Sequence, residues 1–209
     1  MDMAVLPNDQ IVVAGRQDIP NNSAGFCARF TANGLLDPTF GNSGYATFMP
    51  YGWLWNFNRV IAQPDGKLLL CGTGDIVDAV LLRLQPNGTP DSTFGLNGFV
   101  FFTPFDSLSR VELFDITLQP DGKIITTGKR YTSDGGVGSY SKSVTFRLNT
   151  DGSMDNSFGV GGEALYHVAR PRFNYIYRVH LMDDGRIFGR FVDENGSELK
   201  STNKGACSK

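Results

Sequence analysis

The sequence predicts an all-β protein of β-propeller type, built from repeated four-stranded units. Two observations predict it: a sixteen-residue block that occurs three times without a gap, and a turn-containing block before each copy. Composition agrees with both. Glycine is the commonest residue, at 25, and together with 10 prolines it indicates frequent turns. The 16 phenylalanines suit half-buried strands.

The sixteen-residue block spans Arg29–Gly44, Arg83–Gly98 and Arg147–Gly162. Each copy begins with Arg and an apolar residue. Glycine follows five residues after the Arg, Asp eight after, Phe-Gly at eleven and twelve, and a last Gly at fifteen. An ungapped pattern of this kind is the signature of a repeated structural unit.

The second block spans Ala4–Gly15, Ile61–Gly72 and Thr117–Gly128, with a weaker fourth copy at His180–Phe191. In each copy two apolar stretches flank a turn, which is Pro-Asp-Gly in the second and third. Proline presets φ, Asp bonds its own backbone, and Gly tolerates positive φ. The block therefore predicts a tight β-hairpin.

A hairpin, a strand that ends at the Arg, a Gly/Asp turn and an aromatic strand make four strands per unit. Successive Arg positions lie 54 and 64 residues apart (29 to 83 and 83 to 147), a length typical of propeller blades. We expect one repeat domain over residues 1–209, with units of about 1–57, 58–114, 115–177 and a degenerate 178–209. The prediction is three full four-stranded blades plus a degenerate fourth.

These motifs resemble the delta-60 repeat: QPDGK, an apolar strand, an Arg-ended strand, and an Asp-x-Ser/Thr-Phe-Gly-x-x-Gly turn. The resemblance covers Ala4 to about Ala164 well and Val179–Phe191 weakly. It implies a β-propeller unit of unknown biochemical activity, found in large bacterial surface or secreted proteins and in phage structural proteins. The chain departs from the pattern in having only three full units, in showing no leader in MDMAVLPNDQ, and in losing the Phe-Gly turn in its fourth unit.

Closed propellers usually have four to eight blades. The chain therefore predicts either a small four-bladed ring with a degenerate last blade or an open stack. An open stack exposes sheet edges and apolar faces, which favours completion by oligomerisation.

The repeated Arg and Asp, eight residues apart, have two structural interpretations. The Arg donates a bidentate bond to the Asp, or the Asp forms a turn with its own backbone. A calcium ligand is the weaker third interpretation, because the block lacks the other oxygen ligands. The repeated Phe is interpreted as a core anchor. The structural repeat residues are Arg29, Asp37, Phe40, Arg83, Asp91, Phe94, Arg147, Asp155 and Phe158.

Composition and motifs argue against several functions. A net charge of −2 and a pI of about 5.6 do not suit nucleic-acid binding, and no apolar run approaches the roughly 20 residues of a membrane span. No nucleophile elbow, zinc motif or phosphate loop occurs, and the two histidines, His167 and His180, lie in strand-like segments. We expect no enzyme, metal or cofactor.

Three cysteines are too few and too scattered for a disulfide framework. Cys27 and Cys71 are expected as buried strand thiols and Cys207 as a thiol of the polar tail. The Gly- and Ser-rich segment Gly135–Ser143 is expected to be a flexible loop between strands.

Aromatic residues gather in the segments that join one unit to the next, where the copies differ. They either fill the space between blades or form a contact face for another subunit or a surface glycan. The candidate binding residues are Trp53, Trp55, Phe57, Phe105, Phe173, Tyr175 and Tyr177.

The sequence thus predicts a non-enzymatic structural or adhesive module in a larger assembly, a phage tail or virion component or a bacterial surface protein. Its expected partners are other protein subunits, and its expected location is the virion or the cell exterior. The alternative is a stand-alone protein- or carbohydrate-binding propeller. A glycoside hydrolase is a third hypothesis, since paired carboxylates occur on any such surface.

Overall fold

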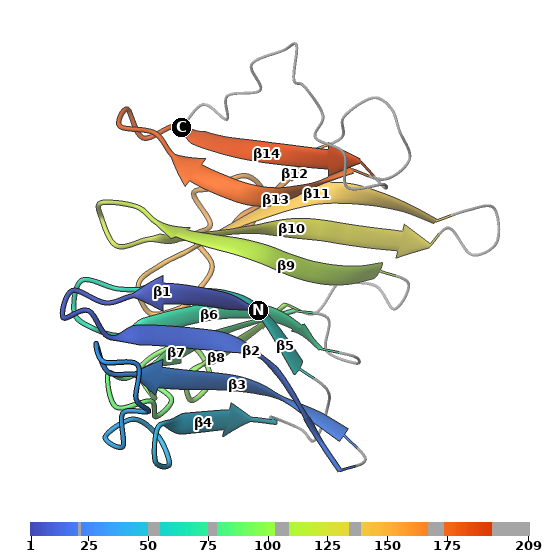
Figure 1. The fold of residues 1–209 in the computed structure, drawn as a ribbon. Coiled ribbons are helices and arrows are strands. Elements are labelled where there is room, and N and C mark those ends of the chain that lie inside the picture. The colour runs from blue at the N-terminus through green and yellow to red at the C-terminus, as the bar shows by residue number, and fades with distance from the viewer. Residues whose placement is uncertain are drawn as a thin grey trace. The chain divides into compact units, whose positions relative to one another are not determined.

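The computed structural model describes residues 1–20, 22–49, 55–74, 79–102, 109–133, 139–166 and 174–193. The strands within these ranges form three four-stranded antiparallel sheets and one two-stranded sheet (Figure 1). This arrangement confirms the predicted all-β repeat architecture, with the fourth unit reduced. Among the described residues, no helix has the length and hydrophobicity needed to cross a membrane.

The chain divides into two compact units, residues 1–102 and 103–209. The first unit holds two sheets. The first sheet has the order β1 (Asp2–Val5), β2 (Ile11–Ile19), β3 (Asn22–Phe30) and β4 (Tyr45–Phe48), and the second has β5 (Trp55–Ala62), β6 (Leu68–Gly74), β7 (Ala79–Leu84) and β8 (Phe99–Phe102).

The second unit holds the other two sheets. The third sheet has the order β9 (Ser109–Leu118), β10 (Ile124–Ser133), β11 (Ser139–Leu148) and β12 (Glu163–Tyr166), and the fourth sheet pairs β13 (Asn174–Leu181) with β14 (Ile187–Asp193).

The first two strands of every sheet are joined by the predicted hairpin. In the second sheet the Gln63 amide donates to the Lys67 carbonyl at 2.8 Å, and Gly66 has a φ of +82°. This is a three-residue loop with a left-handed last residue, a common hairpin connection. In the first sheet Asp9 takes the glycine position with a φ of +61°, a conformation that Asp tolerates better than most residues.

A single apolar core lies between the first and second sheets. Small residues on the first sheet, such as Ala14 and Cys27, face large ones on the second, such as Leu70 and Leu82. The periodicity of the strands explains this division, because alternate side chains of the first sheet point to this core and the others point away. In the second unit β13 contacts β9, β10 and β11 and buries Ile176 and Val179.

One expectation is corrected in the third sheet. The second half of the Gly- and Ser-rich segment is not a loop: Ser139–Ser143 is the start of β11 and pairs with Lys129–Ser133 of β10. Ser141 and Ser143 are buried. Cross-strand pairing to a long β10 outweighs the weak strand propensity of serine.

The contact between the first two sheets is tight at Gly88, which predicts a difference between two glycine substitutions. An added Cβ at Gly88 would lie 3.0 Å from the Gly41 nitrogen and the Phe40 ring, whereas one at Gly161 would meet nothing within 4 Å. Both residues have positive φ, +86° and +62°. Gly161→Ala should therefore cost only the left-handed strain of about 1–2 kcal/mol.

Gly88→Ala should cost about 1–3 kcal/mol more than Gly161→Ala, because the methyl group must displace packed atoms. Denaturant unfolding of the two variants measures the difference. Equal destabilisation would show that the two sheets are not in firm contact at this turn.

Candidate functional site

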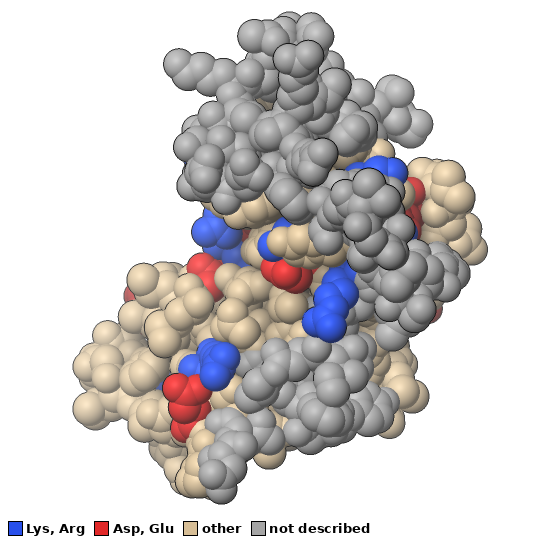
Figure 2. All heavy atoms as spheres, turned by 90° about the vertical axis from the view of Figure 1, so that its right-hand side faces the viewer, with Lys and Arg blue, Asp and Glu red and all other residues tan. Residues whose placement is uncertain are grey.

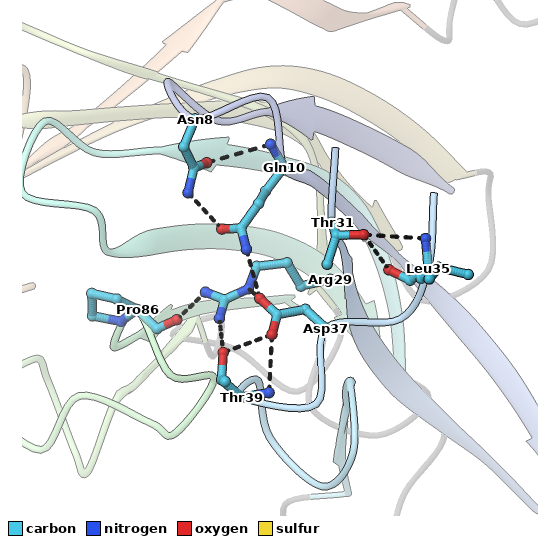
Figure 3. A network of polar contacts seen from close by, with 8 residues as sticks. All are labelled: Asn8, Gln10, Arg29, Thr31, Leu35, Asp37, Thr39 and Pro86. Atoms are coloured by element: carbon cyan, nitrogen blue, oxygen red, sulfur yellow. Dashed lines mark hydrogen bonds and ion pairs between the residues drawn. The ribbon is translucent and has the colours of Figure 1, made fainter. Parts of the chain in front are cut away.

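Each sixteen-residue block folds into a polar turn, here called the corner, that links the third and fourth strands of its sheet. In the first corner the Arg29 Nε donates to the Asp37 Oδ2 at 2.8 Å. The other carboxylate oxygen accepts from the amide and the hydroxyl of Thr39, at 3.0 and 2.7 Å. The Arg29 Nη2 closes the network on the Thr39 hydroxyl at 2.9 Å (Figure 3).

The other two corners repeat these bonds. The Nε–Oδ2 distance is 2.8 Å for Arg83 and Asp91 and 2.7 Å for Arg147 and Asp155. In both, the carboxylate also accepts from the amide and hydroxyl two residues later. The ion pair and the backbone turn therefore coexist. The bond to the carboxylate is not bidentate, because the second guanidinium nitrogen goes to the Thr or Ser hydroxyl.

The repeated Phe lies under the guanidinium in each corner. The guanidinium carbon is 4.9, 4.4 and 4.7 Å from the ring centre in the first, second and third corners. These distances allow a cation–π contact. All three rings are buried, so the Phe also anchors the corner to the core; they are Phe40, Phe94 and Phe158.

A further donor reaches each Asp from the hairpin of the same sheet, at the residue after the turn. Gln10 Nε2 donates to Asp37 at 2.6 Å, and Lys123 Nζ donates to Asp155 at 2.9 Å. In the second sheet Lys67 lies 3.9 Å from the Asp91 carboxylate. Sequence reasoning missed this contact, although Gln, Lys and Lys stand at matching positions of the three hairpins.

The donors in the corner lower the pKa of all three carboxyl groups. Hydrogen bonds from Thr39 lower the pKa of Asp37, and those from Lys123 and Ser157 lower that of Asp155. Burial alone would raise the pKa of Asp91, but the hydrogen bonds from Thr93 and the charge of Arg83 outweigh it. Each corner therefore holds an ionised Asp–Arg pair, and the polar groups nearest the carboxylate already donate hydrogen bonds to it or carry a positive charge beside it.

The first corner also joins the first sheet to the second. Arg29 Nη1 donates to the Pro86 carbonyl (Figure 3). The Gly41 amide donates to the Asn87 carbonyl at 2.7 Å. Pro86 and Asn87 belong to the turn of the second corner. One repeated arginine thus both closes its own corner and holds the adjacent sheet.

The innermost strands carry a second link between neighbouring sheets. Asp2 of β1 accepts from the Val60 amide of β5 at 3.0 Å and lies 3.3 Å from Arg59. In the second unit Asp115 of β9 accepts from the Val179 amide of β13 at 2.8 Å, with the Arg178 guanidinium at 3.7 Å.

These four charged residues occupy the same repeat position, four residues before the residue that precedes each hairpin loop. In the second sheet, for example, Arg59 lies four residues before Gln63. Along the chain they alternate in sign, as Asp2, Arg59, Asp115 and Arg178. Sequence reasoning missed this alternation, because the four residues lie just before the second repeated block, outside the repeated motif itself.

The predicted aromatic binding residues have different environments. Phe57 is 1% exposed and packs against Gly25 of β3, so it fills the space between the first and second sheets. Tyr175 and Tyr177 are half-buried in β13, and Trp55 begins β5. Trp53, Phe105 and Phe173 lie outside the described residues.

Tyr175 belongs to an aromatic cluster around a lysine. Lys129 Nζ lies 5.5, 4.6 and 5.3 Å from the ring centres of Phe114, Tyr131 and Tyr175 and 3.1 Å from a Glu112 carboxylate oxygen. Burial alone would lower the pKa of Lys129, but the charge of Glu112 outweighs it and raises the pKa. Tyr175 thus has a partner within its own unit.

A concave apolar surface lies on the face of the first sheet that points away from the second. We call it the outer face of the first sheet. It has a hollow of about 340 Å³ lined by Val13, Phe26, Ala28, Phe30 and Tyr45, with Arg16 and Gln17 of β2. Met3 and Val5 lie on the same face and are 66% and 65% exposed.

The remaining candidates are placed as follows. Cys27 and Cys71 are buried in strands, and burial raises the pKa of the Cys27 thiol to about 12. His180 is exposed in β13, and His167 and Cys207 lie outside the described residues. Within the described ranges no three His, Cys, Asp or Glu residues gather as a metal site. Figure 2 shows described acidic and basic side chains lying close together on the face displayed.

Comparison with known proteins gives a family match and two structural neighbours. The model of a β-propeller domain of unknown function, DUF5122, matches residues 6–40, 63–94 and 119–158, about half of the chain. This supports a propeller-type repeat family; the delta-60 name stays a resemblance. No curated protein sequence matches the chain.

Both structural neighbours come from Leishmania. A hypothetical protein from Leishmania major is 16% identical with a TM-score of 0.49, and a mannose phosphorylase from Leishmania mexicana, solved with phosphate ion, is 14% identical with a TM-score of 0.48. Each alignment covers 94% of this chain but only 63% and 64% of the neighbour. The chain spans less than two thirds of either protein.

The corner predicts a large difference between two substitutions beside Lys67. The Asp91 side chain is fully buried and bonded to Arg83, so Asp91→Asn should cost about 3–5 kcal/mol by leaving a buried guanidinium without its counter-charge. Asp65→Asn removes a more exposed partner of Lys67 and should cost less than about 1 kcal/mol. Unfolding free energies measure both, and similar values would contradict a structural corner.

The lowered pKa values predict acid sensitivity with a definite sign. A carboxyl whose pKa is lower in the folded state stabilises the protein above its unfolded value of about 4, and this stabilisation is lost as pH falls toward the folded value. Asp155→Asn removes one such group, whose pKa is strongly lowered. Its unfolding free energy should fall less steeply than that of the wild type between about pH 4 and pH 2, as thermal unfolding in a pH series would measure. Parallel curves would contradict it.

Proposed function

The chain belongs to the DUF5122 family of β-propeller domains of unknown function, and we propose that it is a non-enzymatic structural or adhesive module of a larger protein assembly. Its work is to stack sheets on one another and to present their free surfaces to other subunits.

The observation that carries this proposal is the engagement of the repeated polar residues. Arg, Asp and Ser/Thr are the reactive side chains that all three copies share, and in each copy they bond to one another. In the first copy the same Arg reaches the adjacent sheet. The polar side chains that the three copies share therefore hold the sheets together, which supports a structural role. The fold alone does not define an activity.

The resemblance to the delta-60 repeat favours a specific setting. Proteins with that repeat include phage structural components and bacterial surface proteins, so we place this chain in a virion or on a cell surface. Its partners there are copies of itself or other subunits of the assembly.

A second candidate function is supported by the outer face of the first sheet. Its hollow combines aromatic rings from Phe26, Phe30 and Tyr45 with the polar groups of Arg16 and Gln17. Concave apolar surfaces with a few polar groups are typical of ligand sites. A stand-alone propeller that binds a protein segment or a glycan through this hollow is the alternative.

Light scattering of the purified chain over a concentration range separates the two candidates. The structural proposal predicts a multimer, with a mass above the 22.9 kDa of one chain. A chain that stays at 22.9 kDa at every concentration would contradict it.

A glycan array with the wild type and Tyr45→Ala tests the alternative. Glycan binding by a monomer that Tyr45→Ala abolishes would support the second candidate. Hydrolysis of aryl glycosides by the purified chain would contradict both.

A further inference from the structure

The outer face of the first sheet matches, strand by strand, a face that is buried in the second sheet. The row Met3–Val13–Ala28–Tyr45 crosses the four strands of the first sheet. At the same repeat positions the second sheet has the row Val60–Leu70–Leu82–Phe99. That second row belongs to the core covered by the first sheet.

The two rows differ in exposure most clearly on the innermost strand. Val60 is 1% exposed, whereas Met3, its equivalent, is 66% exposed. An added Cβ at Gly88 would collide with the first corner, whereas one at the equivalent Gly34 would meet nothing within 4 Å. The first sheet thus carries a surface of the kind that elsewhere in this chain is covered by a neighbouring sheet.

The other end of the repeat carries the complementary kind of surface. In the first unit the second sheet is covered by the positions Asp2–Ala14 and Ala4–Val12 of β1 and β2. At the same positions of β13 and β14 the fourth sheet has the pairs Arg178–Arg190 and His180–Phe188. Phe188 is 53% exposed and His180 and Arg190 are also exposed, so this face is open.

The sizes of the side chains on the two open faces fit each other. Between the first and second sheets, small Ala14 and Cys27 meet large Leu70 and Leu82. The outer face of the first sheet reverses this order, because Val13 and Ala28 leave a hollow where the second sheet has leucines. Phe188 supplies the larger side chain, standing where the first sheet has Val12. A large residue opposite a hollow restores the packing density of a protein interior.

The charges of the innermost strands fit as well. Their signs alternate in the order Asp2, Arg59, Asp115, Arg178, and each Asp pairs with the following Arg within its unit. If the first sheet of a second copy is placed after the fourth sheet, the Asp2 of that copy follows Arg178 and the alternation of signs continues.

We infer that the outer face of the first sheet binds the fourth sheet of a second copy of this chain, head to tail. The smallest such assembly is a pair of copies, which supplies eight sheets, the upper end of the usual four to eight blades. This inference rests on the proposed function and names its partner and contact surface.

Two substitutions test the contact, one on each face. Met3→Lys and Phe188→Asp change exposed residues, so each chain should still fold. Met3→Lys would place a cation against the fourth-sheet face that carries Arg178 and Arg190, and Phe188→Asp would bury a carboxylate against the apolar outer face of the first sheet. The wild type should have a mass of about 45.8 kDa (2 × 22.9) in light scattering, and each variant should raise the dissociation constant at least about tenfold. Val160→Asp, at an 88% exposed residue of the third corner, is the matched control and should leave the dissociation constant unchanged.

Mixing the two variants distinguishes the head-to-tail contact from a symmetric one. A mixture of Met3→Lys and Phe188→Asp chains keeps one unmodified contact per pair, so it should recover part of the 45.8 kDa species (2 × 22.9) that neither variant forms alone. A pair of first sheets face to face would be insensitive to Phe188→Asp.

The outcomes separate the two proposals. A wild-type multimer that survives both substitutions would overturn this contact and leave the structural function in place. A wild-type monomer at every concentration would overturn both.

Discussion

The structure depends on one ionised contact, the buried pair between the repeated Arg and the Asp eight residues later. In the second sheet this pair joins Arg83 and Asp91, and both side chains are nearly inaccessible to solvent. Such a pair is stable only if its remaining donors and acceptors are satisfied. The Thr93 hydroxyl donates to the carboxylate, the Lys67 ammonium lies 3.9 Å from it, and the Phe94 ring lies under the guanidinium. The corner therefore fixes the angle at which the fourth strand returns to its sheet, which the hydrophobic pattern alone does not determine.

The corner also explains why stacking and folding use the same residues. Arg29 holds Asp37 with one nitrogen, Thr39 with another, and the Pro86 carbonyl of the adjacent sheet with the third. Guanidinium spreads its donors over three nitrogens in one rigid plane and so reaches three separate acceptors, whereas the three donors of lysine sit on one nitrogen without that fixed geometry. A repeat built on this arginine joins its neighbour as it closes its own turn. The fourth unit lacks the Phe-Gly turn, and its two described strands pack on the third sheet through apolar contacts and the Asp115 link.

The sequence predicted the repeat, the hairpins and the Arg–Asp spacing, because each rests on local chemistry that recurs at a fixed interval. It did not predict the strand at Ser139–Ser143, whose pairing with β10 comes from tertiary context rather than propensity. It also missed the Asp2–Val60 and Lys123–Asp155 contacts, which join residues 58 and 32 positions apart. The aromatic residues in the segments between units were only partly informative. Alternation placed Phe57 on a strand face but could not say that the face was internal, since a core face and a contact face have the same period of two.

Sheet stacking makes the two ends of a repeat array unlike its middle. The first sheet covers the second, so large residues such as Leu70 and Leu82 are buried without any special feature in their own sheet. At the first sheet the same positions hold Val13 and Ala28, which are smaller, and at the fourth sheet the covering position holds the larger Phe188. An end exposed permanently to water would be expected to carry polar residues there, as the caps of repeat proteins do. The first sheet instead keeps an apolar row with Met3 and Tyr45 exposed beside an apolar hollow, and a contiguous exposed apolar face is typical of a surface that another protein covers.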